Sequence, residues 1–427
     1  MKIELTDPQQ FKQKALQWAA AFDVFCCLDS NNFIDKYSKF DLLIAAGVKA
    51  EITTQAGSAF EVLEKFRTQN PGWISGFLAY DLKNEIEDLT SGNIDGLHFP
   101  ELYFFAPEHL LIIKGNEAEI ISDAPERVFE DINSEKIVQT ATSSPVELKS
   151  RFSKEEYIDS VVKIKEHISR GDIYVTNFCQ EFYAEKAIID PLSVFVKLND
   201  ISPNPFAAFF KLRSQYILCA SPERFLAKRG NQLISQPIKG TSKRYADPRE
   251  DELSRQKLKG HIKELQENVM IVDLVRNDLT KSAKQGTVNT EELFGIYSFS
   301  QVHQMISTVV CEKSDEITDV QAIRNTFPMG SMTGAPKISA MRLMEQYERS
   351  KRGVYSGAVG YFAADGDFDF NVVIRTLLYD ATEKYLSFQA GSAITYHADP
   401  GQEYEECLLK AQAILEVLGQ SGSFPGP

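Results

Sequence analysis

The chain has 427 residues, of which 43% are hydrophobic and 25% charged, and its formal net charge is −14. These values are typical of a globular protein with an ample core, long enough for one large domain or two ordinary ones. The negative charge argues against nucleic acid or an anionic membrane surface as the main partner, and no apolar run is long enough to span a membrane. A small anionic substrate stays compatible with this charge, because a basic site can lie inside an acidic protein.

The N-terminal stretch and the cysteines predict a cytoplasmic location. The N-terminal stretch MKIELTDPQQF has no signal-peptide core, and the six cysteines form no CxxC pair. Cys26 and Cys27 lie in an apolar, strand-like stretch, where buried thiols are the ordinary interpretation, so a reducing compartment fits best. Residues 419–427 are expected to form a disordered tail.

The N-terminal region, 1–145, alternates short apolar runs with helical patterns. The stretches VFCCLDS, FDLLIAAG and GFLAYDL predict strands, and SAFEVLEKFRTQ predicts a helix. The stretch that follows, NSEKIVQTATSSPVELKS, is polar and rich in Ser and Thr, which predicts a long surface connection to a second region.

The second region, 150–418, begins with a helix signal. Ser153 and Glu156 form a capping-box pattern, and Gly171 predicts the end of that helix. Later, GVYSGAVGYFAA, FDFNVVIRTLLYD and KYLSFQAGSAITY predict three long strands, and the turn DGD joins the first two as a hairpin. Strands in runs, with helices grouped between them, predict an α+β fold in which antiparallel β-sheets pack together and are flanked by helices.

A predicted helix over 261–283 carries two carboxylates on an apolar stripe. In HIKELQENVMIVDLVRNDL, Glu267 and Asp278 share one face with Ile271 and Leu274. Carboxylates that face a core are costly unless they are paired or bound to a metal. An ion pair, for example with Arg276, and a functional site are therefore both open.

The C-terminal helix carries a second charged stripe, formed by Glu403, Glu406 and Lys410. Alone, this pattern is typical of an ordinary solvated ion-pair face. Together with Glu267, these carboxylates would suit Mg²⁺ better than zinc, because no His or Cys spacing typical of zinc is present.

Three other stretches carry residues that gain meaning only in combination. Lys239 ends an apolar, strand-like run in QPIKGTSKR, which is usually a surface position and sometimes a catalytic one. Arg375, among apolar neighbours in NVVIRTLL, needs the carboxylate of either a protein side chain or a ligand. The glycine-containing turn FPMGSMTGAPK precedes a predicted helix, whose start could bind an anion or could simply be capped.

Taken in order, these stretches resemble the chorismate-utilising enzymes, which include anthranilate, isochorismate and aminodeoxychorismate synthases. The stretches that carry the resemblance are GDIYVTNFCQEF, SPERF, PIKGT, ENVMIVDLVRNDL, FPMGSMTGAPK, RGVYSGAVGYF, IRT and EYEECLLKA. The resemblance is dense over 150–418 and looser in the N-terminal third. In PIKGT, Lys239 stands where anthranilate synthases typically carry alanine, which resembles the aminodeoxychorismate synthase component I branch.

The resemblance implies a reaction for this branch. Lys239 would attack ring carbon C2 of chorismate as a neutral amine, and the C4 hydroxyl would leave with help from Glu223 as general acid. Ammonia would then attack C4 and expel the lysine. The product would be 4-amino-4-deoxychorismate, on the route to 4-aminobenzoate and folate.

The resemblance also implies a binding site around this chemistry. Mg²⁺ would be held by Glu267 and Glu406, with Glu403 close by. The residues that would line the substrate pocket are Gly240, Thr241, Ser331, Tyr355, Arg375, Gly391 and Lys410. Gln304 stands where the family usually has histidine, so it could donate a hydrogen bond but could not act as an acid or base.

The remaining expectations concern partners and alternatives. Ser30 matches the segment in which relatives bind tryptophan, although a plain polar loop explains it equally well. No glutamine amidotransferase stretch is evident, so a separate amidotransferase subunit is the expected source of ammonia. Anthranilate or isochorismate synthase activity, or a non-catalytic chorismate- or tryptophan-binding protein, are the alternatives; Lys239 argues against the two other enzymes.

Overall fold

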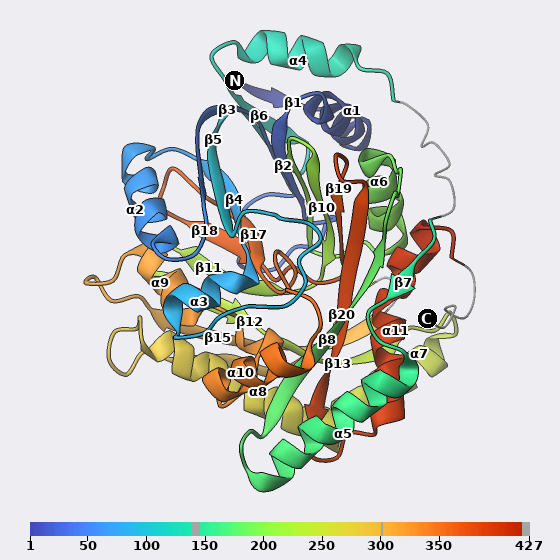
Figure 1. Cartoon of the computed structure of the whole chain (residues 1–427). Coiled ribbons are helices and arrows are strands. Elements are labelled where there is room, and N and C mark those ends of the chain that lie inside the picture. The colour runs from blue at the N-terminus through green and yellow to red at the C-terminus, as the bar shows by residue number, and fades with distance from the viewer. Residues whose placement is uncertain (138–145, 300–301, 421–427) are drawn as a thin grey trace.

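The computed structural model describes residues 1–137, 146–299 and 302–420, and its strands form one continuous antiparallel ladder (Figure 1). In the first half of the ladder the strands follow in the order β7 (Lys149–Ser150), β8 (Val175–Ala184), β20 (Tyr385–Thr395), β19 (Thr376–Asp380), β10 (Gln215–Ser221), β9 (Phe206–Leu212), β2 (Val24–Asp29), β3 (Leu42–Thr54) and β5 (Leu102–Lys114).

The second half of the ladder starts from the same strand β5. Its strands are β4 (Ile74–Leu78), β17 (Ala358–Phe362), β18 (Phe368–Asn371), β11 (Arg224–Arg229), β12 (Gln232–Gln236), β15 (Val302–Glu312), β13 (Ile238–Lys243) and β14 (Asn289–Ser298). Strand β2 of the N-terminal region pairs with β9, and β4 pairs with β17. The N-terminal and C-terminal regions of the chain therefore share one ladder.

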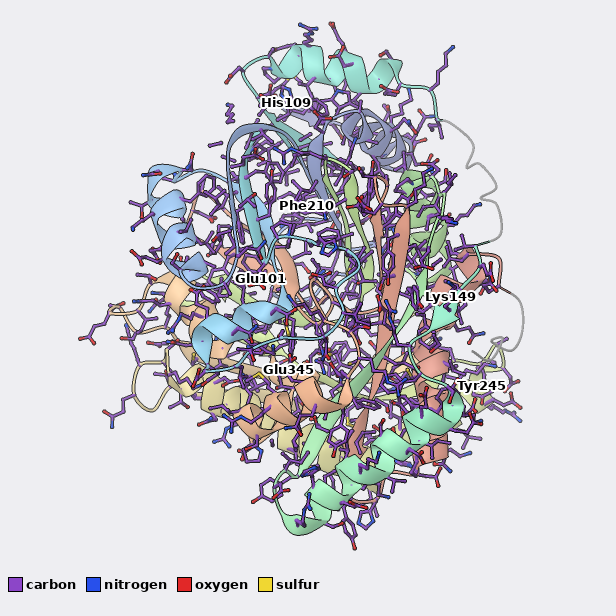
Figure 2. All side chains as sticks on the ribbon, viewed as in Figure 1. Glu101, His109, Lys149, Phe210, Tyr245 and Glu345 are labelled. Carbon is purple, nitrogen blue, oxygen red and sulfur yellow. The ribbon has the colours of Figure 1, made fainter. Side chains whose placement is uncertain are left out.

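Alternating residues explain why the central strands are buried on both faces. In β2, Cys26 belongs to the apolar cluster between the two halves of the ladder, whereas Phe25 belongs to the cluster beneath the helices on the outer face. In β9, Phe210 belongs to the cluster between the two halves and Phe209 to the cluster beneath the helices. Figure 2 shows Phe210 in the interior. Successive side chains of a strand point to opposite faces, so continuous apolar sequence fills two cores at once.

Helices cover the outer faces of the ladder. The cluster on the first half includes residues of α1 (Pro8–Ala20), α4 (Pro125–Ser134), α6 (Pro191–Ile201) and α11 (Pro400–Val417). Beside the second half lie α7 (Pro248–Lys259) and α8 (Ile262–Thr280), and α9 (Asp319–Thr326) contacts α8. Helix α2 (Ala59–Gln69) contacts α9 and β3, and α10 (Lys337–Tyr347) contacts β8 of the first half. Helix α5 (Lys154–Arg170) packs against α11 (Figure 1). The predicted α+β class, with packed antiparallel sheets and flanking helices, is confirmed.

Most local predictions are also confirmed. Ser153 and Glu156 form the expected capping box of α5, and Gly171 ends that helix in the left-handed conformation at φ +84°. The turn between β17 and β18 makes the predicted hairpin. Asp278 is ion-paired as the structural alternative proposed, although with Lys337 of α10 (2.6 Å) rather than with Arg276.

One predicted strand is wrong. The run FDFNVVIRTLLYD forms two strands, β18 and β19, separated by residues 372–375, and Arg375 in this break has φ +51°. The break is fixed by tertiary hydrogen bonds: the Ser356 N–H donates to Val373 O (2.8 Å), and the Ala220 N–H donates to Arg375 O (3.2 Å). Apolar, β-branched sequence gives no local sign of such an interruption.

Two other predicted strands are shorter than expected, one predicted connection is partly buried, and some expectations fall outside the described residues. The strands predicted in GFLAYDL and GVYSGAVGYFAA are limited to β4 and β17. The connection after the N-terminal region is not wholly superficial, because Val146 and Leu148 are buried in a core cluster. Residues 138–145 and nearly all of the tail lie outside the described residues. No helix in the described part of the chain is long and apolar enough to cross a membrane.

Candidate active site

Lys239 lies near the start of β13, at a register shift opposite β15. The next residue, Gly240, has φ +96°, a conformation that favours glycine. A side chain at this position would also be crowded, because its Cβ would stand 3.3 Å from the Cβ of Glu264. The ammonium group of Lys239 favours the ionised forms of carboxylates from the β10–β11 turn, α8 and α11, namely Glu223, Glu264, Glu267 and Glu406.

Glu223 lies in the turn between β10 and β11 and is only 4% exposed. Its backbone N–H donates to Ser221 Oγ (3.2 Å), which helps to hold the turn. Burial raises the pKa of the Glu223 carboxyl to about 7, although the Ser331 hydroxyl and the charge of Lys239 limit the rise. At neutral pH this carboxyl group therefore exists in both protonated and ionised forms, which suits general acid–base chemistry.

Glu267 and Glu403 are buried although they come from different helices, at 7% and 2% exposure. Burial raises the pKa of each carboxyl, and the nearby charge of Glu406 raises both further. Between them lies Lys263, whose Nζ is 3.1 Å from Glu403 Oε1 and 3.8 Å from Glu267 Oε1. The interpretation of the charged stripe on α11 as an ordinary solvated ion-pair face is therefore wrong for Glu403.

Glu406 and Lys410 form an ion pair one helical turn further along α11, at 2.8 Å. Lys410 also donates to the carbonyl oxygen of Gly391 in β20 (3.0 Å). Both side chains stay about two-fifths exposed, at 43% and 40%. Partial burial acts to raise the pKa of Glu406, but the ion pair with Lys410 outweighs it and the pKa is lowered.

Arg375 projects from the break between β18 and β19. Among the described residues, no side chain forms an ion pair or a hydrogen bond with its guanidinium group, although the charge of Glu223 acts on it. Both alternatives, a protein carboxylate and a ligand carboxylate, therefore stay open. Burial lowers the pKa of Arg375 to about 10, while the nearby charge of Glu223 opposes this change. An arginine that stays charged and unpaired beside an acidic group is suited to bind a ligand carboxylate.

Tyr355 lies beside the same part of the ladder. Its hydroxyl is 3.8 Å from Cys179 Sγ, and Cys179 in β8 pairs with Gly391 in β20. Burial raises the pKa of the Tyr355 hydroxyl well above its ordinary value, which keeps it a neutral hydrogen-bond donor.

Behind Tyr355 lies a buried ion pair that the sequence did not reveal. Arg352 binds both carboxylate oxygens of Glu348, at 2.7 and 2.9 Å. Glu348 accepts the backbone N–H of Cys179 (3.0 Å), and Arg352 donates to Asn177 O (2.8 Å). This pair fixes the start of β8 behind the cleft. Lys263 was also missed, although its position four residues before Glu267 was a usable signal.

The other predicted pocket residues are less closely connected. Ser331, in a short 3₁₀ turn, lies beside Glu223. Thr241 lies opposite Gln304 in the β13–β15 ladder, and Gln304 is 1% exposed with no partner for its Oε1 among the described residues. The neighbouring His303 is held by Ser298 (2.8 Å) and Asp251 (3.1 Å). Roles for these residues stay predictions.

The predicted Mg²⁺ ligands lie near one another and are partly engaged by lysines. Within the described residues, no three His, Cys, Asp or Glu side chains form a ready-made metal cluster. However, Glu267 Oε1 is buried and accepts no hydrogen bond among the described residues, and the charge of Glu406 raises the pKa of Glu264, Glu267 and Glu403. Carboxylate oxygens from Glu267, Glu403 and the partly exposed Glu406 are the kind of ligand that a hard divalent cation such as Mg²⁺ prefers.

Ser30 lies in a different pocket, with an empty volume of about 550 Å³ including its mouth. The pocket is lined by residues that include Phe40, Arg224, Tyr361 and Asp369, and the Ser30 hydroxyl is buried without a partner among the described residues. The structure therefore does not place Ser30 with the Lys239 group.

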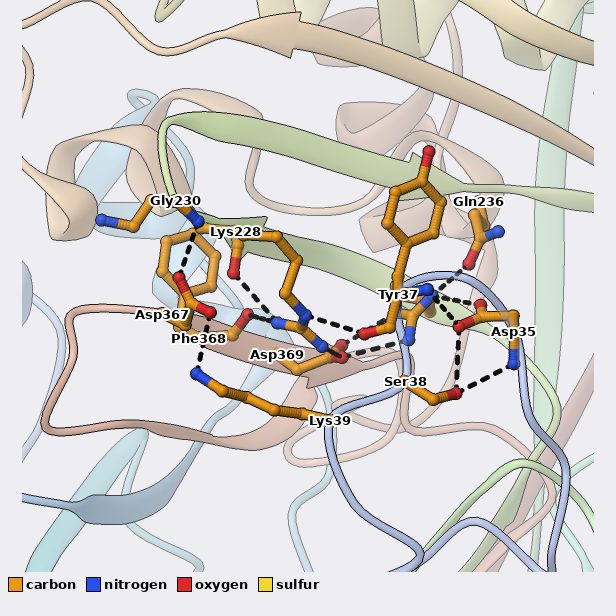
Figure 3. A network of polar contacts seen from close by, with 12 residues as sticks. Asp35, Tyr37, Ser38, Lys39, Lys228, Gly230, Gln236, Asp367, Phe368 and Asp369 are labelled. Atoms are coloured by element: carbon orange, nitrogen blue, oxygen red, sulfur yellow. Dashed lines mark hydrogen bonds and ion pairs between the residues drawn. The ribbon is translucent and has the colours of Figure 1, made fainter.

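Several residues of the Ser30 pocket lining, among them Asp35 and Asp369, belong to a polar network (Figure 3). Arg224, the residue after Glu223, binds Asp35 of the N-terminal loop (2.7 Å) and Asp369 of β18 (3.0 Å). Asp369 also binds Arg229. The network ties the loop after β2 to the strands that follow Glu223.

Replacing Asp369 by alanine is expected to lower the free energy of unfolding by about 3 kcal/mol, because it leaves Arg224 and Arg229 without their shared buried partner. The change should be measured by urea unfolding. Asp365→Ala, which removes an exposed carboxylate near the same hairpin, is the control and should change stability by less than about 1 kcal/mol. Equal effects of the two substitutions would show that the network does not stabilise the fold.

Comparison with known proteins places this arrangement in a family. A family model described as chorismate binding enzyme matches residues 25–416. The chain belongs to the chorismate-binding enzyme family. Among curated relatives, it is 33% identical over 351 residues to aminodeoxychorismate synthase component 1 of Klebsiella aerogenes, covering 81% of this chain and 77% of that protein.

Two other similarities extend this finding. The chain is 40% identical over 277 residues to a probable chloroplastic aminodeoxychorismate synthase of Oryza sativa subsp. japonica, covering 63% of this chain but only 31% of the plant protein. It thus spans less than a third of that relative's length. The crystal structure of anthranilate synthase component I from Streptococcus pneumoniae matches with a TM-score of 0.77 and 24% identity, covering 90% of this chain and 93% of that one, which confirms the fold.

Proposed function

We propose that this member of the chorismate-binding family aminates chorismate at C4 and forms 4-amino-4-deoxychorismate. The observation that carries the proposal is the position of Lys239, an amine beside Glu223, whose pKa is raised to about 7 by burial. A nucleophile next to a group that can give and take a proton is the arrangement that a covalent substitution needs. The relatives named aminodeoxychorismate synthase support the same activity.

The first step forms a bond between Lys239 Nζ and C2 of chorismate. The electron pairs of both ring double bonds shift, from C1–C2 to C1–C6 and from C5–C6 to C4–C5, and the bond between C4 and its hydroxyl oxygen breaks. Protonated Glu223 donates its proton to the departing hydroxyl, which leaves as water. Hydroxide is a poor leaving group, so this proton transfer lowers the barrier by stabilising charge that develops in the transition state.

The second step reverses the shift of the ring double bonds. Ammonia attacks C4, both double bonds return to their original positions, and the bond from C2 to Lys239 breaks, so that the lysine leaves as a neutral amine. The new ammonium group at C4 gives one proton to the Glu223 carboxylate. The enzyme is then restored, and the sum is chorismate plus ammonia giving the amino product plus water.

Other side chains would bind the enolpyruvyl carboxylate and the ring of the substrate. The unpaired guanidinium group of Arg375 and the neutral hydroxyl of Tyr355 would hold the enolpyruvyl carboxylate. Lys410, anchored on Gly391 O, would stand near the ring. These assignments explain how an acidic protein can accept a dianion.

Glu267 and Glu406, with Glu403 close by, would hold Mg²⁺ between α8 and α11. When bound, the ion would bind the ring carboxylate and offset charge that accumulates near C2. The observation that supports this set is that Glu267 Oε1 is buried and accepts no hydrogen bond among the described residues.

Replacing Glu406 by glutamine is expected to weaken Mg²⁺ binding at least about tenfold, because the ligand loses its charge, with little loss of stability. Mg²⁺ titration followed by calorimetry measures the change. Glu405→Gln is the matched control, since the neighbouring carboxylate is exposed and pairs with Lys154 on the other side of the helix. An unchanged Mg²⁺ affinity in Glu406→Gln would contradict the ligand assignment.

Ammonia would come from a separate glutamine amidotransferase subunit, as the component 1 name of the bacterial relative suggests. Tryptophan binding at the Ser30 pocket stays a prediction, supported by the unpartnered hydroxyl of Ser30.

The proposed function is tested by trapping the covalent step. The chain is mixed with chorismate and Mg²⁺, quenched in acid, digested and analysed by mass spectrometry. We expect the peptide that contains Lys239 to gain the mass of chorismate less one water. Lys243→Ala, an exposed lysine on the same strand, should leave the adduct unchanged, and Lys239→Ala should abolish it. Amino product without any adduct would contradict the proposed function.

A further inference from the structure

Lys263 occupies a position that none of the steps above uses. It lies in the first turn of α8, four residues before Glu267, so the two side chains share one face of the helix. Its ammonium group also reaches Glu403 in the first turn of α11, at 3.1 Å. One lysine therefore links the two helices that carry the acidic residues.

The surroundings of Lys263 differ from those of an ordinary surface lysine. Glu403 is 2% exposed and Glu267 is 7% exposed, whereas the side chain of Lys263 is 36% exposed. The charges of the buried Glu267 and Glu403 are thus compensated by the partly exposed ammonium group of Lys263. Because buried charges need a counter-charge, removing this cation leaves Glu267 and Glu403 uncompensated unless another cation replaces it.

We propose that Lys263 is an internal counter-ion that holds the place between Glu267 and Glu403 until a divalent cation displaces it, and that this competition sets the Mg²⁺ affinity. The proposal rests on the metal role in the proposed function. Lys410 differs from Lys263, because its ammonium group contacts both Glu406 and the carbonyl oxygen of Gly391 and would keep the second contact if Glu406 bound a metal. Lys263 has no such carbonyl partner among the described residues.

The competition has a predictable direction. Binding of a divalent cation by Glu267 and Glu406, with Glu403 close by, requires the ion pairs of Lys263 with Glu267 and Glu403 to loosen, so part of the binding free energy is lost in breaking those contacts. A neutral side chain of similar length at this position removes that cost. It also leaves the carboxylates repelling one another when no metal is bound.

The test measures Mg²⁺ binding by calorimetry on the whole chain without substrate. Lys263→Met is expected to bind Mg²⁺ about tenfold more tightly than the wild type. Its thermal midpoint without Mg²⁺ should fall, and saturating Mg²⁺ should raise that midpoint by more than in the wild type. Lys263→Arg keeps the charge and should bind Mg²⁺ with nearly wild-type affinity. Lys259→Met, an exposed lysine at the end of α7, is the matched control and should leave affinity and midpoint unchanged.

The outcomes separate this proposal from the metal assignment. Equal or weaker Mg²⁺ binding by Lys263→Met, in a protein whose wild type binds Mg²⁺, would overturn the role of Lys263 alone. Absence of Mg²⁺ binding in wild type and variant would overturn both the metal assignment and the competition. If Lys263→Met does not fold, Lys263→Gln gives the same measurement with a polar side chain.

Discussion

Replacement of Lys239 by alanine is expected to reduce formation of 4-amino-4-deoxychorismate by about a thousandfold or more, because the covalent step disappears. Any amination that remains should shift toward C2 and give an anthranilate-type product. The change should not disturb folding, since Lys239 makes no ion pair or hydrogen bond with its side chain among the described residues. Product analysis by chromatography, with circular dichroism as the folding check, measures both effects.

Lys243→Ala is the control for this experiment. Lys243 lies four residues further along β13 and is exposed, so it tests whether loss of a positive charge near the cleft is sufficient. Full activity in Lys243→Ala and loss in Lys239→Ala would support the nucleophile role. An unchanged rate and product in Lys239→Ala would contradict the nucleophile role of Lys239.

Replacement of Glu223 by glutamine is expected to lower kcat by about 10²- to 10⁴-fold, because the departing hydroxyl loses its proton donor. The pH profile gives a sharper test. Burial raises the pKa of Glu223 to about 7, so the protonated acid is lost as the pH rises through 7. The kcat/KM of the wild type should therefore fall on the alkaline side of about pH 7, and this limb should vanish in the variant.

The same pKa makes a prediction about stability. The folded-state pKa of about 7 lies above the ordinary value of 4.5, so the folded state binds a proton more tightly than the unfolded state. The resulting stabilisation is complete below about pH 4.5 and is lost as the pH rises to about 7, with a total of about 3 kcal/mol. Glu223→Gln should lack this decline in urea unfolding at pH 5 and pH 8. An identical decline in both proteins would assign it to other groups.

The fold was accessible from the sequence where local signals agree with tertiary structure. The capping box at Ser153 and Gly171 defined α5, and the runs around Cys26 and Ala358 marked strands. The break before Arg375 was not predictable, because it depends on hydrogen bonds from Ser356 and Ala220, which are distant in the sequence. Local propensity cannot report contacts of this kind.

The candidate site was accessible in a different way. Residue types and the family resemblance identified Lys239, Glu223 and Glu267, and the structure brings these three together. The counter-charges were not accessible, because helix periodicity places Glu403 on a face without saying what covers it. The pairing of the buried Glu403 in α11 with Lys263 in α8 is a tertiary contact, which helix periodicity does not report.

The most direct test of the central claim is the identity of the product. The purified chain is incubated with chorismate, Mg²⁺ and an ammonium salt, and the products are separated and identified by mass spectrometry and fluorescence. The account predicts 4-amino-4-deoxychorismate, which an added lyase converts to 4-aminobenzoate. Anthranilate as the product would show that amination occurs at C2 and would contradict the assignment of Lys239.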